Sequence, residues 1–407
     1  MNTLSQTVKL FITIVMIIIS TYTSSAEIKK QRARDLGIPF IGETGPLNAI
    51  TDVSGVEVGH VTIIKGDGKL VVGKGPVRTG VTAIHPRGKN SLSPVFGGWF
   101  TLNASGEMTG TTWLEERGLI DGPILITNTH SVGVVRDAAV AWMVDKKWPA
   151  DWHAPIIAET YDGSLNDING FHVTKEHALE ALSIASSGIV EEGSVGGGTG
   201  MFCNSFKGGI GTSSRKIKVD NKNYTLGVLV QCNYGGYDFI LGGTSIFNKI
   251  GRGSHCYTDR SIERKFSEVP YCDDVAKKES IIKSKRDGSI IIVVATDAPL
   301  LPHQLKRLAK RPSLAIGKLG GYSHNGSGDI FLAFSTAANN KLSEDNYSEI
   351  EMYPNNQLYF IFEAAVNATE EAIVNAMVAA DTMIAVDGLR IEALPEDKIK
   401  KIMMQKK

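Results

Sequence analysis

Asp287-Gly288-Ser289-Ile290-Ile291-Ile292-Val293-Val294-Ala295 is the stretch that best indicates how this chain folds and works. A charged segment stops at one glycine, and the serine then opens an unbroken apolar run, which is typical of a strand covered on both faces. Such a junction is commonly just a turn before a strand, but it also suits a chain that cuts itself between Gly288 and Ser289. A serine at a new N-terminus carries its own base, because a free α-amine has a pKa of about 8 and accepts the hydroxyl proton. Glycine before the serine leaves the carbonyl of that bond open to attack.

The rest of the chain alternates strand-like and helix-like segments. Apolar runs predict further strands over residues 54–63, 123–127 and 224–231. Apolar residues at helical spacing predict helices over 134–144, 174–185, 303–311 and 364–383, and in the last of these Glu370 and Glu371 are expected to point away from the core. Strands that are apolar on both faces need helices over them, so the pattern favours a layered α/β sandwich.

Length and charge bound the function. The chain has 407 residues, enough for one large domain or two ordinary ones, and its 43 basic and 43 acidic residues leave a formal net charge of zero. This balance gives no electrostatic footprint for nucleic acid or for an anionic surface. The glycine-rich segment 193–200 lacks the Lys-Ser/Thr ending of a phosphate-binding loop, so structural glycines are favoured over a nucleotide site.

The N-terminus has the pattern of a secretory signal. Lys9 precedes an apolar run over 10–19, and Ser24 and Ala26 fit a small-x-small cleavage site. We therefore predict a signal peptide over 1–26, a single mature domain over 27–407, and export to the periplasm or the medium. An uncleaved membrane anchor is the alternative. Without a second long apolar segment, no stable membrane contact is expected once the signal is removed.

Export makes disulfides plausible for the four cysteines. Cys256 and Cys272 bracket a polar, charged segment and are predicted to pair. Cys203 and Cys232 lie in apolar runs and are predicted to be buried free thiols. The segment 250–287 as a whole is predicted to be an exposed linker that can part at the Gly288-Ser289 junction. No cysteine or histidine spacing indicates a metal site.

Polar residues elsewhere could serve an N-terminal serine. Ser327 and Asp329 lie two residues apart at the start of a predicted strand, where both could steady the amine or hydroxyl of Ser289. A tyrosine hydroxyl and an asparagine amide are suitable oxyanion donors, which makes Tyr161 and Asn233 candidates. Each of these clusters, taken alone, also fits an ordinary loop.

Taken together, these segments resemble the L-aminopeptidase/D-esterase (DmpA-like) family of self-processing N-terminal-serine peptidases, which includes the β-peptidyl aminopeptidases. The resemblance covers nearly all of residues 37–390, in order. The pieces that carry it are residues 45–53, 78–84, 127–133, 159–161, 206–215, 288–289, 295–301 and 325–329.

The resemblance implies a fold, a set of roles and an assembly. The fold would be a four-layer αββα sandwich like that of N-terminal-nucleophile hydrolases and ornithine acetyltransferases. Cleavage after Gly288 would give an α chain of 27–288 and a β chain of 289–407, with Ser289 as nucleophile and Ser327 beside it. Asp329 stands where some relatives carry glutamate. Tyr161 and Asn233 would stabilise the oxyanion, and Glu159 would hold a substrate's free ammonium.

The same resemblance implies an aminopeptidase that acts on peptides, amides or esters without metal or cofactor, assembled as a tetramer of αβ units. Two other functions stay open at this point. One is an acyltransferase of the ornithine-acetyltransferase type, against which the serine and the export signal count. The other is an exported binding protein that keeps the fold but never cleaves.

Overall fold

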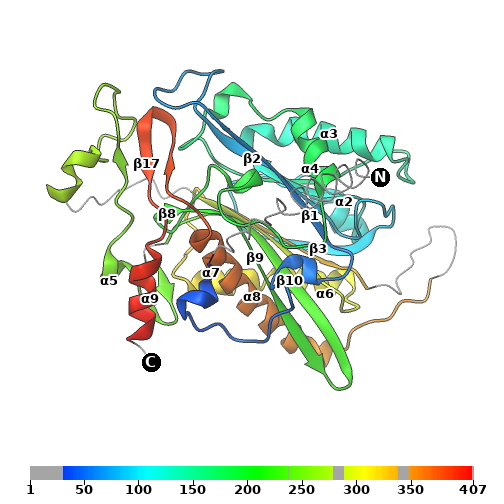
Figure 1. Cartoon of the computed structure of the whole chain (residues 1–407). Coiled ribbons are helices and arrows are strands. Elements are labelled where there is room, and N and C mark those ends of the chain that lie inside the picture. Colours follow the sequence, from blue (N-terminus) through cyan, green and yellow to red (C-terminus); the bar gives the residue numbers. More distant parts are fainter. Residues whose placement is uncertain (1–30, 237, 278–287, 338–347, 406–407) are drawn as a thin grey trace, which may run out of the picture. The chain divides into compact units, whose positions relative to one another are not determined.

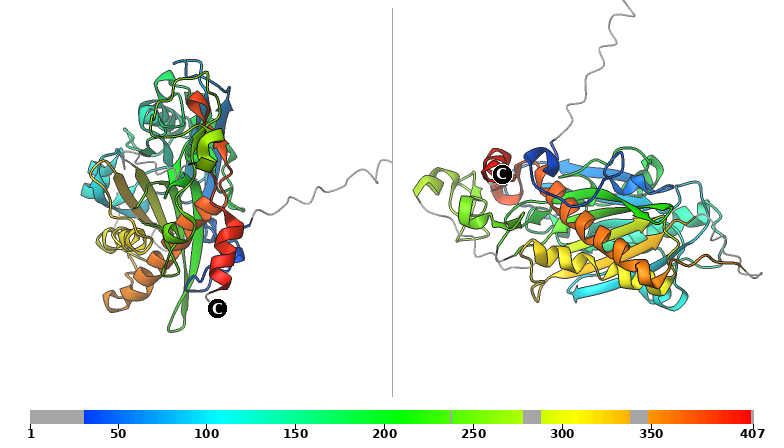
Figure 2. Two further views of the ribbon diagram at one scale, coloured as in Figure 1. Left: turned by 90° about the vertical axis from the view of Figure 1, so that its left-hand side faces the viewer. Right: turned by 90° about the horizontal axis from the view of Figure 1, so that it is seen from below.

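Two β-sheets lie face to face between two layers of helices (Figures 1 and 2). The computed structural model describes residues 31–236, 238–277, 288–337 and 348–405, and all of these from Arg32 onward belong to one unit that spans Arg32–Lys407. The predicted signal peptide over 1–26 falls outside the described residues.

The smaller of the two facing sheets has the strand order β1-β2-β5-β6, and the larger has the order β4-β3-β15-β14-β10-β9. The strands of the first are β1 (Glu57–Lys65), β2 (Val77–His85), β5 (Ile124–Asn128) and β6 (Ile156–Thr160). Those of the second are β4 (Leu119–Ile120), β3 (Val95–Ala104), β15 (Gly328–Ser335), β14 (Ser289–Thr296), β10 (Lys222–Asn233) and β9 (Gly209–Val219).

Small sheets and short helices complete the described chain. The strands are β7 (Phe202–Cys203), β8 (Phe206–Lys207), β11 (Ile240–Leu241), β12 (Thr244–Ser245), β13 (Cys256–Tyr257), β16 (Met383–Ile384) and β17 (Leu389–Ile391). The 3-10 helices are η1 (Ala33–Leu36), η2 (Ile50–Asp52), η3 (Thr129–Ser131), η4 (Ile168–Gly170), η5 (Gly196–Gly198), η6 (Cys272–Lys277), η7 (Asn355–Gln357) and η8 (Val386–Gly388).

The α-helices form the two outer layers and the periphery. They are α2 (Thr111–Arg117), α3 (Val132–Asp145), α4 (Lys175–Ile184), α5 (Phe247–Ile250), α6 (Pro302–Ala309), α7 (Pro312–Lys318), α8 (Leu358–Val378) and α9 (Glu396–Met404). Helices α3 and α4 cover the outer face of the smaller sheet, whereas α6, α7 and α8 cover that of the larger one. Figure 2 shows α8 (orange) running across the larger sheet.

The position of strand β14 in the sandwich explains why its sequence is continuously apolar and does not alternate with polar residues. Ile291 and Val293 point between the two sheets, whereas Ile290 and Ile292 point toward the helices on the outer face. Every residue of the strand is buried, because it lies in the centre of the larger sheet and both of its faces are covered. The predicted four-layer αββα sandwich is confirmed by this arrangement.

Helix α8 departs from the prediction made for its two glutamates. Glu370 and Glu371 are buried instead of pointing away from the core. Glu371 forms ion pairs with Arg34 and Arg215, each at 2.8 Å. Glu370 forms one with Lys318 at 2.5 Å. The expectation was wrong because these cations come from η1, β9 and α7, whose packing against the helix cannot be read from the spacing within α8.

The cysteines form two disulfides. The Cys256–Cys272 bond is present as predicted, but Cys203 and Cys232 are bonded to each other and are not free thiols. Hairpin strand β7 lies against the end of β10, which places the two Cα atoms 5.7 Å apart. Apolar surroundings alone therefore did not distinguish a buried thiol from a buried disulfide.

The stretch predicted as an exposed linker over 250–287 is partly built into the fold. His255, Cys256, Tyr257 and Val269 are buried, and β13 pairs with β17 in a small separate sheet. Within 250–277 the expectation of an exposed linker is therefore wrong, because this small sheet has an apolar cluster of its own. Residues 278–287 lie outside the described part of the chain.

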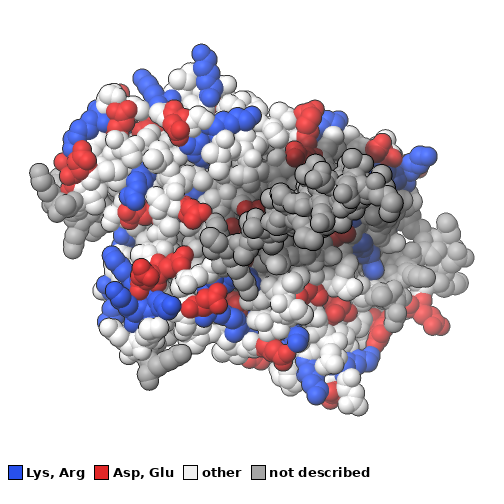
Figure 3. Space-filling model, in the orientation of Figure 1, with Lys and Arg blue, Asp and Glu red and all other residues white. Residues whose placement is uncertain are grey.

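Two further features concern the charge on the surface and the packing of the glycine-rich segment. Basic and acidic side chains are interspersed over the face drawn in Figure 3. Gly197 is wedged between the sheets, where a Cβ would stand 2.2 Å from Oε1 of Gln231, so close packing accounts for the absence of a side chain. Among the helices of the described residues, we find none that is long and apolar enough to cross a membrane.

The buried carboxylate of Glu371 gives the first testable prediction. Glu371→Ala would leave two buried or half-buried guanidinium groups without their partner, which typically destabilises a fold by about 3–5 kcal/mol. We expect the urea unfolding midpoint to fall clearly. Glu363→Ala, at an exposed position on the same helix, is the control and should leave the midpoint almost unchanged. Equal midpoints for the two variants would contradict a structural role of the ion pairs.

Candidate active site

Ser289 lies at the start of the central strand β14, where three strand ends meet at one edge of the larger sheet. Its neighbours across the ladder are Asn233, at the end of antiparallel β10, and Gly328, at the start of parallel β15. The side chain is only 4% exposed. The fold thus places the predicted nucleophile directly between two of the segments that sequence reasoning had singled out.

Gly288 is held close to both neighbouring strands. Its carbonyl oxygen accepts a hydrogen bond of 3.2 Å from the backbone N–H of Gly328. A Cβ at this position would stand 2.4 Å from the carbonyl oxygen of Asn233, which no side chain could tolerate without a shift. A glycine is therefore required before Ser289, and its carbonyl is already polarised by a backbone donor.

Ser327 and Asp329 form a hydrogen-bonded pair beside Ser289. The Ser327 hydroxyl donates to Oδ1 of Asp329 at 2.6 Å, and both side chains are almost fully buried. The carboxyl of Asp329 also contacts the side chain of Ser323 and the backbone N–H of Ile290. Burial raises the pKa of Asp329, while these hydrogen bonds act in the opposite direction. The pair is thus anchored to the residue that follows Ser289.

The amide of Asn233 has a fixed orientation. Its Nδ2 donates to the carbonyl oxygen of Tyr161 at 2.8 Å, and its Oδ1 accepts from the backbone N–H of Phe202 at 2.9 Å. The second hydrogen on Nδ2 is the one that Asn233 can offer to an oxyanion. Two backbone groups therefore determine where this donor points.

Tyr161 contacts Asn233 through its backbone, and a role of its hydroxyl as an oxyanion donor stays a prediction. Its backbone carbonyl, and not its hydroxyl, contacts Asn233. The side chain is 46% exposed and folds back over Gly163, where an added Cβ would stand 2.4 Å from the hydroxyl oxygen. Burial and the neighbouring Asp162 raise the pKa of the phenol, so it stays protonated at neutral pH.

Glu159 is buried at the end of β6, facing the same region. Its Oε1 accepts from the backbone N–H of Glu107 at 2.9 Å, and the Thr129 hydroxyl donates to Oε2. The Cβ position of Gly106 would be 3.0 Å from Oε1 of Glu159 and 3.2 Å from the Cα of Gly328, so the carboxylate is close to the backbone beside Ser289. Burial raises the pKa of Glu159. A cation would offset that burial, which suits an ammonium-binding group.

Sequence reasoning missed the residues that support these groups. Asn128, at the end of β5, donates a hydrogen bond of 2.8 Å to the hydroxyl oxygen of Thr79 on β2. It also donates one of 3.0 Å to the carboxyl of the buried Asp162. Polar residues at the end of a buried strand are the signal that could have found Asn128. Asp162 directly follows the segment 159–161, for which the sequence predicts roles of Glu159 and Tyr161 only.

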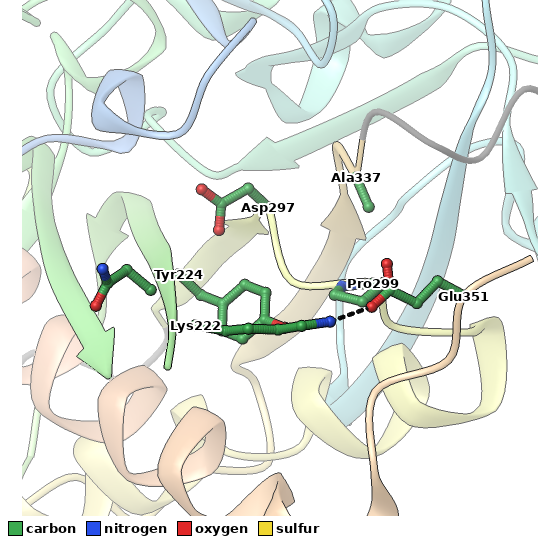
Figure 4. Close-up of a pocket in the computed structure, with 7 residues that line it drawn as sticks. Lys222, Tyr224, Asp297, Pro299, Ala337 and Glu351 are labelled. Atoms are coloured by element: carbon green, nitrogen blue, oxygen red, sulfur yellow. Dashed lines mark hydrogen bonds and ion pairs between the residues drawn. The ribbon is translucent and has the colours of Figure 1, made fainter. Parts of the chain in front are cut away.

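An open hollow of about 300 Å³ lies elsewhere on the molecule. It is lined by Tyr224, Asp297 and Pro299 and by an ion pair between Lys222 and Glu351 at 2.5 Å (Figure 4). Asp297 follows the last residue of β14, whereas Ser289 is the first, so this hollow and the candidate site lie at opposite ends of the strand. Within the described residues, no group of three or more histidine, cysteine or acidic side chains could hold a metal ion.

Comparisons with known proteins agree with this geometry. The sequence profile of peptidase family S58 matches residues 48–391. The β-peptidyl aminopeptidase BapA of Sphingosinicella microcystinivorans is 55% identical over 381 residues, which cover 93% of each chain. The L-aminopeptidase D-Ala-esterase/amidase of Ochrobactrum anthropi, described as a variant of the Ntn-hydrolase fold, superposes with a TM-score of 0.80. It is 42% identical, and the match covers 93% of this chain and 99% of that one.

A β-aminopeptidase from Burkholderia sp. superposes with a TM-score of 0.77 at 41% identity, over 92% of this chain and 99% of the other. The matches thus run through all four layers and through every segment that converges on Ser289. The chain belongs to peptidase family S58, and it is a hydrolase of the serine aminopeptidase class.

Proposed function

We propose that this protein is exported, cuts itself between Gly288 and Ser289, and then uses the new N-terminal serine to remove N-terminal residues from peptides, amides or esters. The observation that carries the proposal is the position of Ser289, the first residue of a buried central strand, with Asn233 and Gly328 as its neighbours. The names of the relatives, which include a β-peptidyl aminopeptidase and an L-aminopeptidase D-Ala-esterase/amidase, support the substrate class.

Self-cleavage starts with attack of the Ser289 hydroxyl oxygen on the Gly288 carbonyl carbon. The C–N bond breaks as the C–O bond forms, and the nitrogen takes up a proton, so the acyl group moves from nitrogen to oxygen. Water then hydrolyses the ester and leaves a carboxylate on Gly288 and a free α-amine on Ser289. The N–H of Gly328, 3.2 Å from the Gly288 oxygen, stabilises the charge that develops there.

In turnover the α-amine of Ser289 is the general base for its own hydroxyl, because its pKa of about 8 lies close to working pH. The Ser327 hydroxyl, oriented by Asp329, can accept a hydrogen bond from the amine and keep it in place. Asn233 donates its second N–H to the oxyanion. The Tyr161 hydroxyl, which lies near Gly163, is the second candidate donor to the oxyanion.

Glu159 selects substrates with a free N-terminal amine. Its carboxylate is buried near Gly328 and is held by Glu107 and Thr129. An ammonium group there would gain a strong charge-assisted hydrogen bond in a region shielded from water. An acylated N-terminus would leave the carboxylate uncompensated.

Loss of the nucleophile is the first test. Ser289→Ala should remain a single chain after purification, whereas the wild type should give two fragments by intact mass spectrometry. Ser313→Ala, a half-buried serine on α7, is the control and should be cleaved like the wild type. Cleavage of Ser289→Ala at the same bond would refute the proposal, because the Ser289 hydroxyl would then not be needed for cleavage.

Substitution of the ammonium anchor is the second test. Glu159→Gln should raise KM for an amino-acid amide by about 30-fold or more, the usual effect of removing one partner of a buried charge pair, with a smaller change in kcat. It should also narrow the preference for a free amine over an N-acetylated substrate. Glu180→Gln, on the exposed side of α4, is the control. An unchanged preference in Glu159→Gln would remove this residue from substrate recognition.

The pH dependence of kcat/KM and KM distinguishes the role of the Ser289 amine from that of the Glu159 carboxylate. For wild type, kcat/KM should fall as pH drops below about 8, because the Ser289 amine becomes protonated. KM should rise on further acidification, and at a higher pH than for an ordinary glutamate, because burial raises the pKa of Glu159. Glu159→Gln should abolish the pH dependence of KM but keep the amine limb. Loss of both limbs in this variant would contradict the assignment.

Export and assembly complete the proposal. The mature α chain should begin at Glu27, and the protein should elute as a tetramer of αβ units in size-exclusion chromatography with light scattering. A substrate panel of L-amino amides, D-amino esters and β-peptides, run with and without an added amine acceptor, distinguishes a hydrolase from an acyltransferase. Transfer that outpaces hydrolysis would favour the acyltransferase.

A further inference from the structure

A buried carboxyl group lies directly behind the candidate oxyanion donor and has no part in the mechanism above. Asp162 follows Tyr161, and none of its surface is exposed. Its Oδ2 accepts a hydrogen bond of 3.0 Å from Nδ2 of Asn128, which also donates to Oγ1 of Thr79 at 2.8 Å. Both hydrogens of the Asn128 amide are therefore used, and Thr79 fixes which way the amide faces.

Two oxygen atoms in this group lack a donor. Oδ1 of Asp162 and Oδ1 of Asn128 are both buried, and neither has a hydrogen-bond partner among the described residues. The side chains of Thr79 and Asn166 approach the carboxyl, but neither reaches Oδ1 with the distance and angle of a hydrogen bond. Buried hydrogen-bond acceptors are rarely left without a donor. A proton on one of these two oxygens, donated to the other, is the simplest way to pair them both.

A proton on Oδ1 of Asp162 would supply that donor. The carboxylic acid would then donate to Oδ1 of Asn128 while its Oδ2 accepts from Nδ2, which closes a ring of two hydrogen bonds between acid and amide. Turning the amide over leads to the same requirement, because the amide oxygen would then face Oδ2 of Asp162. In either orientation of the amide, an ionised Asp162 leaves at least one buried oxygen of this pair without a donor.

Charge and burial favour the protonated form. Burial raises the pKa of Asp162 to about 7, and only hydrogen bonds from neutral groups act against it. Tyr161 on the same loop is a titratable neighbour. The charged group placed next to this turn is the Lys265 ammonium, which donates to the carbonyl oxygen of Gly163 at 3.0 Å and not to the Asp162 carboxyl. The Arg78 guanidinium on β2 pairs with Asp67 at 2.7 Å, and among the described residues no cation forms an ion pair with the Asp162 carboxyl.

The position of Asp162 connects this pair to Asn233. The peptide unit between Tyr161 and Asp162 carries the carbonyl oxygen that Nδ2 of Asn233 binds at 2.8 Å. On its other side, the carbonyl of Asp162 accepts from the backbone N–H groups of Leu165 and Asn166 at 2.8 and 3.0 Å. The side chain thus ties a tight turn to strands β2 and β5 of the smaller sheet, while the preceding carbonyl orients a side chain of the larger one.

We propose that Asp162 acts as a neutral carboxylic acid, paired with the amide of Asn128, and is the positioning residue that holds the Tyr161 carbonyl and thereby aims the free N–H of Asn233 at the reaction centre. This inference rests on the proposed role of Asn233. A neutral pair holds the turn rigidly without requiring a counter-ion beside the Glu159 anchor.

The test compares a variant that keeps the ring with one that removes it. Asp162→Asn can form the same two hydrogen bonds as an amide–amide pair, so kcat/KM should stay within about threefold of wild type at pH 7. Asp162→Ala should lower kcat about tenfold or more, short of the roughly 10²–10³-fold loss seen when an oxyanion donor itself is removed, with little change in KM. Asp297→Asn, at the far end of β14, is the control and should match wild type.

A second readout does not depend on activity. In the uncleaved Ser289→Ala background, infrared spectra should show the carbonyl band of a protonated carboxylic acid at pH 6, and this band should be missing when Asp162→Asn is added. The band remains measurable even if the protein neither cleaves itself nor hydrolyses peptides, so failure of the inference is distinguishable from failure of the proposed function. No band that is lost with Asp162, or an Asp162→Asn enzyme as impaired as Asp162→Ala, would overturn it.

Discussion

The register of three strands in the larger sheet is the constraint on which the rest of the structure depends. Strand β14 pairs antiparallel with β10 and parallel with β15, so that Asn233, Ser289 and Gly328 lie side by side at one edge. A shift by one residue would turn every side chain of β14 to the opposite face and break the apolar contacts on both sides. The contacts that stabilise the core therefore also determine where the serine stands.

The two sheets are joined by polar contacts as well as by apolar packing. Gln231 on β10 donates to the Thr127 carbonyl on β5 at 3.0 Å and to the Thr160 hydroxyl on β6 at 2.7 Å. Two residues along β10, Asn233 binds the Tyr161 carbonyl. These contacts fix the end of β6, with Glu159, relative to the end of β10. A buried polar network of this kind is directional, so it sets positions that apolar packing alone would leave adjustable.

Much of the fold could be predicted from the sequence, because apolar patterning is a local signal. The run after Gly288 identified β14, and the segments predicted as helices contain or overlap α3, α4, α6 and α8. Contacts between distant segments were harder to foresee. The burial of Glu371 depends on arginines from η1 and β9, and the Cys203–Cys232 bond depends on how β7 meets β10. Neither the ion pairs of Glu371 nor the Cys203–Cys232 disulfide can be recognised from the spacing of residues within one segment.

In the candidate site, too, some features could be predicted from the sequence and others depend on contacts between distant segments. The sequence pointed to the residue types that suit an N-terminal serine, and the strands bring Ser289, Asn233, Ser327 and Asp329 together. The hydroxyl of Tyr161 and the supporting roles of Asn128 and Asp162 depend on side-chain orientation, which only the packed structure defines.

N-terminal sequencing of the purified protein tests the central claim most directly. The account predicts two N-termini in equal amounts, of which one reads Ser289-Ile290-Ile291-Ile292. A single N-terminus from a protein that is active on amino-acid amides would contradict it, because the base that we assign to the reaction would not exist.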